Sequence, residues 1–214
     1  MAVVNIAKRS VTPNTWETLH TVGSGNELAI LSMIIHNWDF ETGRCILGVM
    51  DDILTELGTP TNLTVTPQGT AGTTTYSYAV SAINANGETL ACTKVSTTTG
   101  NATLDGTNFN RLSWASVSGA TGYIIYKESS GVLYFLAKVG AVTTYDDTSA
   151  VSVNTAIRSP FVNTTKISMV LAYEQLTAKI SAGSDYKFFF PQNTKLVFAG
   201  DLEKISVLLC GDES

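Results

Sequence analysis

The two histidines, His20 and His36, are the side chains best suited to proton transfer near neutral pH. Neither stands near a Cys or Ser nucleophile signature. The sequence contains no Gly-x-Ser-x-Gly elbow, His-Glu-x-x-His pair, phosphate loop or dinucleotide fingerprint. An isolated histidine on a strand is most often a surface or hydrogen-bonded residue. We therefore predict no catalytic residue and no enzymatic activity.

Two pairs of adjacent carboxylates, Asp51–Asp52 and Asp146–Asp147, could contribute oxygen ligands to a calcium ion. Neither pair has the further spaced oxygen ligands of a known calcium loop, so we predict solvated turns at both places. A glycosidase needs two opposed carboxylates at a set separation, which the sequence does not position. No metal site and no cofactor are predicted.

Three cysteines stand far apart, at Cys45, Cys92 and Cys210. Their odd number and wide spacing match neither a disulfide framework nor a zinc site, so buried thiols are expected. Cys45 and Cys210 fall in the same predicted domain below. Whether they pair stays open, because a disulfide depends on geometry.

The composition predicts an all-β protein. Of 214 residues, 44% are hydrophobic and only 14% are charged, and Thr, Ser, Asn and Gly are abundant. The net charge is −5 and no basic tract is present, which argues against nucleic-acid binding. The N-terminus does not resemble a signal peptide, and the longest apolar run, residues 28–35, is too short to span a membrane. We expect a protein that stays in the cytosol or leaves it without such a signal.

The outer parts of the chain are predicted to be strands joined by polar turns. In the N-terminal part, a hairpin of residues 28–38 and 44–50 is expected, and an alternating strand at 16–22 precedes it. The strands predicted in the C-terminal part are residues 166–173, 176–180, 186–190, 196–198 and 205–209, with a turn at 182–184.

Two proline-marked changes of composition, at Gly58-Thr59-Pro60 and Ser159-Pro160, enclose a middle part rich in Thr, Ser, Gly and Tyr. Each outer part is too short to bury a good core by itself. We predict that residues 1–58 and 159–214 together form a discontinuous β-sandwich or jelly roll. Residues 59–158 then form a separate inserted β-sandwich, since domain termini usually lie close together.

The middle part resembles a fibronectin-type-III or other immunoglobulin-like domain. The resemblance rests on five segments of the sequence: residues 60–65, 76–89, 112–114, 119–127 and 143–147. Trp114 is expected to anchor the core, and Asn86-Gly87 to supply the positive φ angles of a tight hairpin. In ordinary fibronectin modules the Trp strand precedes the strand that ends in Ala-x-Asn-x-x-Gly, whereas here it follows that strand. This order resembles a variant found in tailed-phage virion proteins and some bacterial surface proteins.

The outer parts resemble sandwich domains of phage accessory virion proteins, through residues 3–9, 23–28 and 205–211 and the Ile-rich segment between them. The resemblance implies a capsid decoration or head/neck protein, assembled in the host cytoplasm, that exposes the immunoglobulin-like domain on the virion surface. Its partners would be major capsid, neck or tail proteins. The alternatives are a tail-tip, baseplate or fibre component that contacts the host receptor, and a carbohydrate-binding module that recognises host-surface glycans.

The run Phe188, Phe189 and Phe190 cannot be buried completely on a one-sided strand. We predict that it forms an interface, and that the protein is a homo-oligomer, with a trimer favoured. Further aromatic side chains could form a contact surface or the core of the middle domain: Tyr123, Tyr126, Tyr134, Phe135 and Tyr145.

Overall fold

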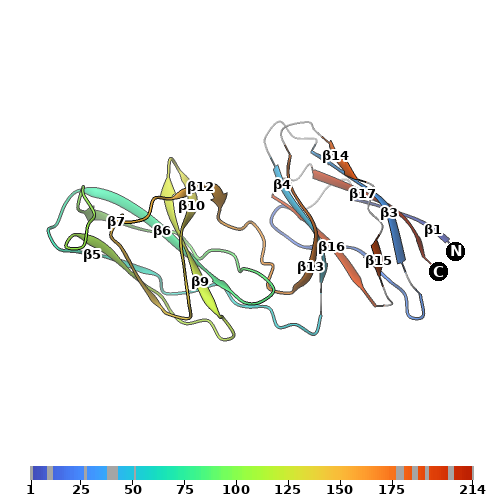
Figure 1. Ribbon diagram of the computed structural model, residues 1–214, viewed down its shortest axis with the longest axis horizontal. Coiled ribbons are helices and arrows are strands. Elements are labelled where there is room, and N and C mark those ends of the chain that lie inside the picture. The colour runs from blue at the N-terminus through green and yellow to red at the C-terminus, as the bar shows by residue number, and fades with distance from the viewer. Residues whose placement is uncertain are drawn as a thin grey trace. The chain divides into compact units, whose positions relative to one another are not determined.

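The chain divides into two compact units, Met1–Leu54 with Lys166–Ser214, and Thr55–Thr165. The structure is a computed structural model, and it describes residues 2–8, 12–26, 28–37, 43–50, 52–176, 181–184, 188–190, 193–201 and 205–213. All regular elements in these ranges are β-strands, which confirms the predicted all-β class (Figure 1). The first unit is built from both ends of the chain, and the second interrupts it between two of its strands.

The first unit is a sandwich of two antiparallel sheets. One sheet has the order β1-β17-β3-β14, with β15 also paired to β3, and the other has the order β13-β4-β16-β2. The strand bounds are β1 Ala2–Lys8, β2 Glu17–Thr21, β3 Leu28–Asn37, β4 Gly43–Met50, β13 Ile167–Leu176, β14 Ser181–Ser184, β15 Phe188–Phe190, β16 Lys195–Gly200 and β17 Ile205–Glu213.

This strand order is that of a jelly roll. If β14 and β15 are taken as one interrupted strand, the unit has eight strands in chain order. The first, eighth, third and sixth form one sheet, and the fifth, fourth, seventh and second form the other. Consecutive strands thus alternate between the sheets, except the fourth and fifth, which pair directly. That pair, β4 and β13, is where the second unit interrupts the first.

Two local predictions for the first unit are wrong. The predicted hairpin of residues 28–38 and 44–50 does not form, because β3 and β4 belong to opposite sheets. The predicted turn at residues 182–184 lies within β14, where the backbone pairs with β3 from His36 to Met33. Small residues favour turns in a sequence, but here the main-chain ladder with a long neighbouring strand outweighs that preference.

Many of the buried side chains described in the first unit lie on β4 and β16, which are neighbours in one sheet. Leu47 of β4 lies directly opposite Phe198 of β16, and these two side chains are 1% and 0% exposed. Leu196 and Ala199 are also fully buried. Burial of these apolar side chains stabilises the pairing of β4 with β16.

The second unit, which we call the inserted module, is also a two-sheet sandwich. One sheet has the order β11-β8-β5 and the other β12-β10-β9-β6-β7. The strand bounds are β5 Thr64–Gln68, β6 Thr74–Ile83, β7 Val95–Gly100, β8 Phe109–Ser113, β9 Gly122–Ser129, β10 Val132–Val139, β11 Thr144–Asp147 and β12 Asn154–Arg158.

The module has the spatial order of an immunoglobulin sandwich, in which strands A, B and E share one sheet and C, F and G share the other. β5, β8 and β11 occupy the A, B and E positions, and β9, β6 and β7 occupy C, F and G. Along the chain the order is A, F, G, B, C, E. Trp114, next to β8, therefore follows the strand that leads to Asn84, as its place in the sequence indicated.

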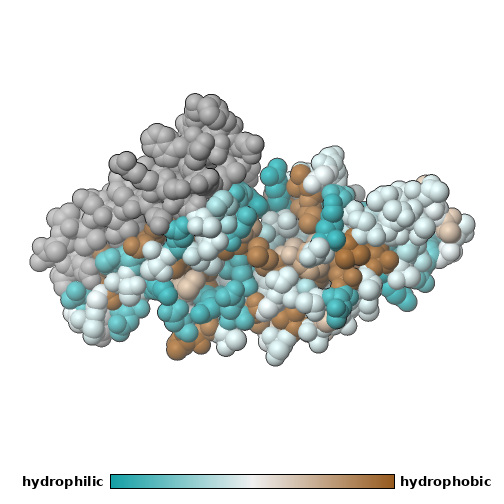
Figure 2. All heavy atoms as spheres, turned by 180° about the vertical axis from the view of Figure 1, so that it is seen from behind, coloured by the Kyte–Doolittle hydropathy of each residue, from teal (hydrophilic) through white to brown (hydrophobic). Residues whose placement is uncertain are grey.

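The module core contains Trp114, which is 5% exposed and meets the ring of Tyr123 edge to face at 5.3 Å between centroids. This confirms the core role predicted for Trp114. Tyr123 and Tyr126 are buried, whereas Tyr134, Phe135 and Tyr145 are partly exposed. The surface of the module in Figure 2 mixes hydrophilic and near-neutral residues with smaller apolar areas.

The incoming and outgoing segments of the module are hydrogen-bonded to each other, and we call this region the stem. The Leu57 amide donates to Thr165 Oγ1 at 3.0 Å, and Asn163 Nδ2 donates to the Leu57 carbonyl at 2.9 Å. Phe161 and Val162 are buried. The predicted limits of 59 and 158 are therefore too narrow, because the stem residues on both sides belong to the module.

Candidate functional site

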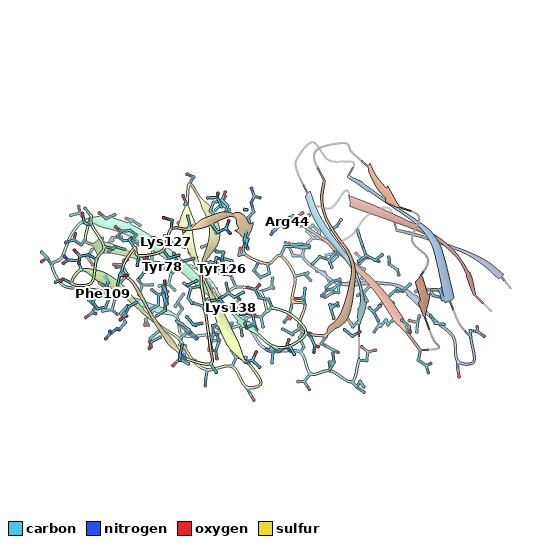
Figure 3. All side chains as sticks on the ribbon, viewed as in Figure 1. Arg44, Tyr78, Phe109, Tyr126, Lys127 and Lys138 are labelled. Atoms are coloured by element: carbon cyan, nitrogen blue, oxygen red, sulfur yellow. The ribbon has the colours of Figure 1, made fainter. Side chains whose placement is uncertain are left out.

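Four polar side chains form a closed cluster at the centre of the module, which we call the clamp. Tyr78 on β6 and Lys127 on β9 are cross-strand neighbours in the five-stranded sheet. Asn110 on β8 and Asp147 on β11 are cross-strand neighbours in the three-stranded sheet. Each pair points inward, so the clamp joins the two sheets across the core (Figure 3 labels Tyr78 and Lys127).

The hydrogen bonds of the clamp converge on one carboxylate oxygen. Tyr78 Oη donates to Asp147 Oδ2 at 2.6 Å, and Lys127 Nζ donates to the same oxygen at 2.7 Å. Asn110 Nδ2 donates to Tyr78 Oη at 2.9 Å. The other carboxylate oxygen, Asp147 Oδ1, accepts from the Ser149 amide at 2.9 Å. Charge-assisted bonds of this length are the stronger class of protein hydrogen bond.

The clamp is enclosed by protein. Asn110 and Tyr78 are 0% exposed, Asp147 is 1% exposed, and the Lys127 side chain is 16% exposed. Burial, and then the hydrogen bond to Asp147, raise the pKa of the Tyr78 phenol. The Lys127 ammonium also lies 4.8 Å from the centroid of the Tyr76 ring and 5.8 Å from that of Tyr78. Such a site holds a charge pair but admits no bulky substrate.

One polar atom of the clamp is not satisfied. Asn110 Oδ1 is buried and has no hydrogen-bond partner among the described residues. Trp114 Nε1, elsewhere in the core, is also buried without a hydrogen-bond partner among the described residues. A buried acceptor without a partner costs free energy, so such atoms are uncommon in folded proteins. The carboxamide of Asn110 is therefore the most unusual group in the clamp.

A second polar group lies at the hairpin of residues 84–88. Glu88 Oε1 accepts hydrogen bonds from Ser81 Oγ and from Tyr126 Oη, the latter at 2.6 Å. Burial raises the pKa of the Glu88 carboxyl, while these two hydrogen bonds and the charge of Lys138 act in the opposite direction. The Glu88 amide and carbonyl both bond to Thr164. Glu88 thus fixes the stem to the sheet.

The turn before Glu88 differs from the prediction. Neither Asn86 nor Gly87 has a positive φ. The Asn84 side chain closes the turn instead, because its Oδ1 accepts from both the Asn86 and the Gly87 amides at 2.9 Å. Gly87 is needed for a different reason, since a Cβ atom there would lie 2.3 Å from Thr164 Oγ1.

The two predicted acidic pairs have different surroundings. Asp52 forms ion pairs with Lys195 at 3.2 Å and Lys166 at 3.7 Å, and Asp51 lies outside the described residues. Asp146 binds Arg111 at the surface. The prediction of a solvated turn is wrong for Asp147, because alternation along β11 turns its carboxylate into the core.

Each unit has a surface cleft. In the jelly-roll unit, a cleft of about 320 Å³ is bordered by Met50, Asp52, Ser168 and Lys195, beside Ile53, which is 91% exposed. In the module, a cleft of about 280 Å³ is bordered by Pro60, Leu63 and Cys92. Neither collects a set of groups that could act together in catalysis.

The remaining predicted site residues are placed as follows. Phe188, Phe189 and Phe190 form β15 against Ile30, Ala29 and Leu28, but their side chains lie outside the described part, so the predicted interface stays a prediction. Cys92 is a buried thiol whose pKa is raised by burial, and Cys45 is fully buried. The side chains of Cys210 and His36 also lie outside the described part. His20 is half-buried on β2.

Sequence reasoning missed the clamp, although a signal for part of it was present. Alternation along β9 puts Lys127 on the same face as Tyr123 and Ile125, which are core residues. A lysine at an inward position needs a buried partner. For its partner Asp147, the sequence predicted only a solvated turn together with Asp146.

Among the described residues, no group of three or more His, Cys, Asp or Glu side chains is arranged to hold a metal ion. Within the same part of the chain, no helix is long and apolar enough to cross a membrane. No protein-family model, no curated protein and no solved structure matches the chain.

Proposed function

We propose that this chain is a structural protein of a tailed-phage particle, most simply a capsid decoration or head/neck protein. The jelly-roll unit would attach to major capsid, neck or tail proteins, and the inserted module would be exposed on the particle surface. The protein would act by binding, without a covalent step on its partners.

One observation carries the proposal: a complete immunoglobulin-like sandwich interrupts a complete jelly roll between β4 and β13. Jelly rolls are used by viral capsid domains, and also by lectins and cupins, so the fold supports the proposal by analogy alone. The insertion adds a second argument. The stem ties the two ends of the module to each other, so the insertion leaves the strand order of the jelly roll unchanged. A domain inserted in this way suits a display role.

The polar groups of the module are in keeping with a structural role. The clamp is enclosed, and Glu88 is engaged by Ser81, Tyr126 and the stem. Both groups hold parts of the module together. A carbohydrate-binding role remains the alternative, and a glycan array with the purified chain separates the two functions.

The test is to find the protein in purified particles of the phage whose genome encodes it. Mass spectrometry of the particles should detect the chain, and antibodies against residues 55–165 should label their surface. A variant in which a short Gly-Ser linker replaces these residues should still join the particle but lose the label. If purified particles contain no copy of the chain, the proposal is wrong.

The predicted trimer is tested separately by light scattering of the purified chain. Phe189→Ser should reduce the molar mass to that of a monomer if the Phe188–Phe190 run forms the subunit interface. Val142→Ser, at an exposed position of the module, is the matched control. A wild-type chain that is monomeric at all concentrations would contradict the oligomer.

A further inference from the structure

Three groups of the clamp have complementary chemistry: an amine, a carboxamide and a carboxylate. The Lys127 amine is 2.7 Å from Asp147 Oδ2, and Asn110 is the direct cross-strand neighbour of Asp147. Tyr78, the neighbour of Lys127 on the other sheet, is 2.9 Å from the Asn110 carboxamide nitrogen. Lys127 and Asn110 are therefore the two ends of one hydrogen-bonded series that runs through Tyr78 and Asp147.

We propose that Lys127 and Asn110 become joined by an intramolecular amide bond, with Asp147 moving the protons, so that a covalent link connects the two sheets of the module. This inference does not depend on the proposed function, because it concerns the covalent structure of the module only.

The reaction needs no further reactant. The Lys127 ammonium gives a proton to Asp147 Oδ2, and the neutral amine attacks Cγ of Asn110. The Nζ–Cγ bond forms, the Cγ–Nδ2 bond breaks, and Nδ2 takes the protons that it needs through Asp147 and leaves as ammonia. The products are a secondary amide, a protonated Asp147 and one ammonia molecule, so atoms and charge balance.

The fold favours each step. Lys127 Nζ lies 2.7 Å from Asp147 Oδ2, so a proton can pass between them directly. The fold gathers the amine and the carboxamide into one enclosed cluster, which replaces a bimolecular encounter by an intramolecular one. Because Asn110 is 0% exposed, water has little access to hydrolyse the new amide.

The link would also resolve the unsatisfied atom. Asn110 Oδ1, which has no partner among the described residues, becomes the carbonyl oxygen of the amide, and the protonated Asp147, on the paired strand, then carries a proton that it can donate. The same three residues thus explain an unusual buried acceptor and an enclosed lysine together.

The direct test is the intact mass of the full chain under denaturing, reducing conditions. The wild-type mass should fall short of the sequence mass by one ammonia molecule. A protease digest should contain a linked pair of peptides, one with Asn110 and one with Lys127. Lys127→Met and Asp147→Asn should each restore the full mass, whereas Lys94→Met, which removes a surface lysine paired with Glu128, should keep the deficit.

A second reaction gives the same mass loss and must be separated from the first. Asn86-Gly87 could lose ammonia by forming a backbone succinimide, which mild alkali hydrolyses, while a side-chain amide survives this treatment. A wild-type chain of full sequence mass overturns the proposal, and so does a deficit that persists in Lys127→Met.

Discussion

The described cores of the two units of this chain differ in chemistry. The described core of the jelly-roll unit is built from apolar side chains of neighbouring strands, such as Leu47 and Phe198. The module has an apolar core around Trp114, but it adds the clamp, in which buried charges bind across the two sheets. Apolar contacts tolerate small shifts, whereas hydrogen bonds to one carboxylate oxygen fix the sheets at a definite position.

The largest effect is expected from removing a core side chain in either unit. Trp114→Ala should destabilise the module, and Phe198→Ala the jelly-roll unit, each by about 3–5 kcal/mol. Hydrogen exchange measured by mass spectrometry should show the lost protection only in the unit that carries the substitution. Equal loss of protection in both units would mean that they unfold together, and the comparison above would fail.

Ion pairs of different exposure give the next test. Arg44 of the jelly-roll unit bonds to Asp201 through both its backbone amide, at 2.6 Å, and its Nε, at 2.7 Å, in a largely shielded setting. Arg44→Met should cost about 1.5–3 kcal/mol, the range for hydrogen bonds to charged groups.

The control for Arg44 is Arg111→Met in the module, where Arg111 is 51% exposed and its bond to Asp146 is open to solvent. We expect no measurable change in the denaturant midpoint for this variant. A larger loss of stability for Arg111→Met than for Arg44→Met would show that burial does not set the strength of these ion pairs.

The stem is tested by Gly87→Ala. The added Cβ would lie 2.3 Å from Thr164 Oγ1 and 2.6 Å from the Thr164 carbonyl oxygen, so the outgoing segment must move. We expect the free energy of unfolding of the module to fall by about 1–3 kcal/mol, as for other overpacked sites. Gly106→Ala is the matched control, because nothing lies within 4 Å of its Cβ. Equal denaturant midpoints for the two variants would contradict a tightly packed stem.

The smallest effect concerns pH. Because burial raises the pKa of Glu88 in the folded module, the folded state holds this proton more tightly than the unfolded chain does. Module stability should therefore fall as the pH rises from the ordinary glutamate pKa through the raised value. Glu88→Gln should flatten this dependence, measured by denaturant midpoints over that pH window. An unchanged slope would assign the pH dependence to other groups.

The sequence was sufficient to predict the all-β class and many of the strands, but it did not predict which strands pair. The apolar, Ile-rich run at residues 28–38 and the segment at 44–50 were predicted as strands of one hairpin, whereas β3 and β4 lie in opposite sheets. The two-residue alternation of side chains tells which residues share a face of a strand, but it does not identify the strands that pair with it.

The candidate site was harder to predict for a related reason. Tyr78 and Asp147 are 69 residues apart in the chain, and they meet only because the permuted strand order brings β6 over β11. Trp114 was predictable as a core residue from its size alone. A charge in the core needs a partner, and that partner is defined by the tertiary fold rather than by any local pattern.

The stem has a consequence for the history of this chain. Since Leu57 is hydrogen-bonded to Asn163 and Thr165 within the module, a recombination event with breakpoints near residues 55 and 165 would transfer a whole folding unit. The receiving gene needs only a tolerant loop between two paired strands. Residues 55–165 are therefore suited to horizontal exchange between unrelated host proteins as a single piece of DNA.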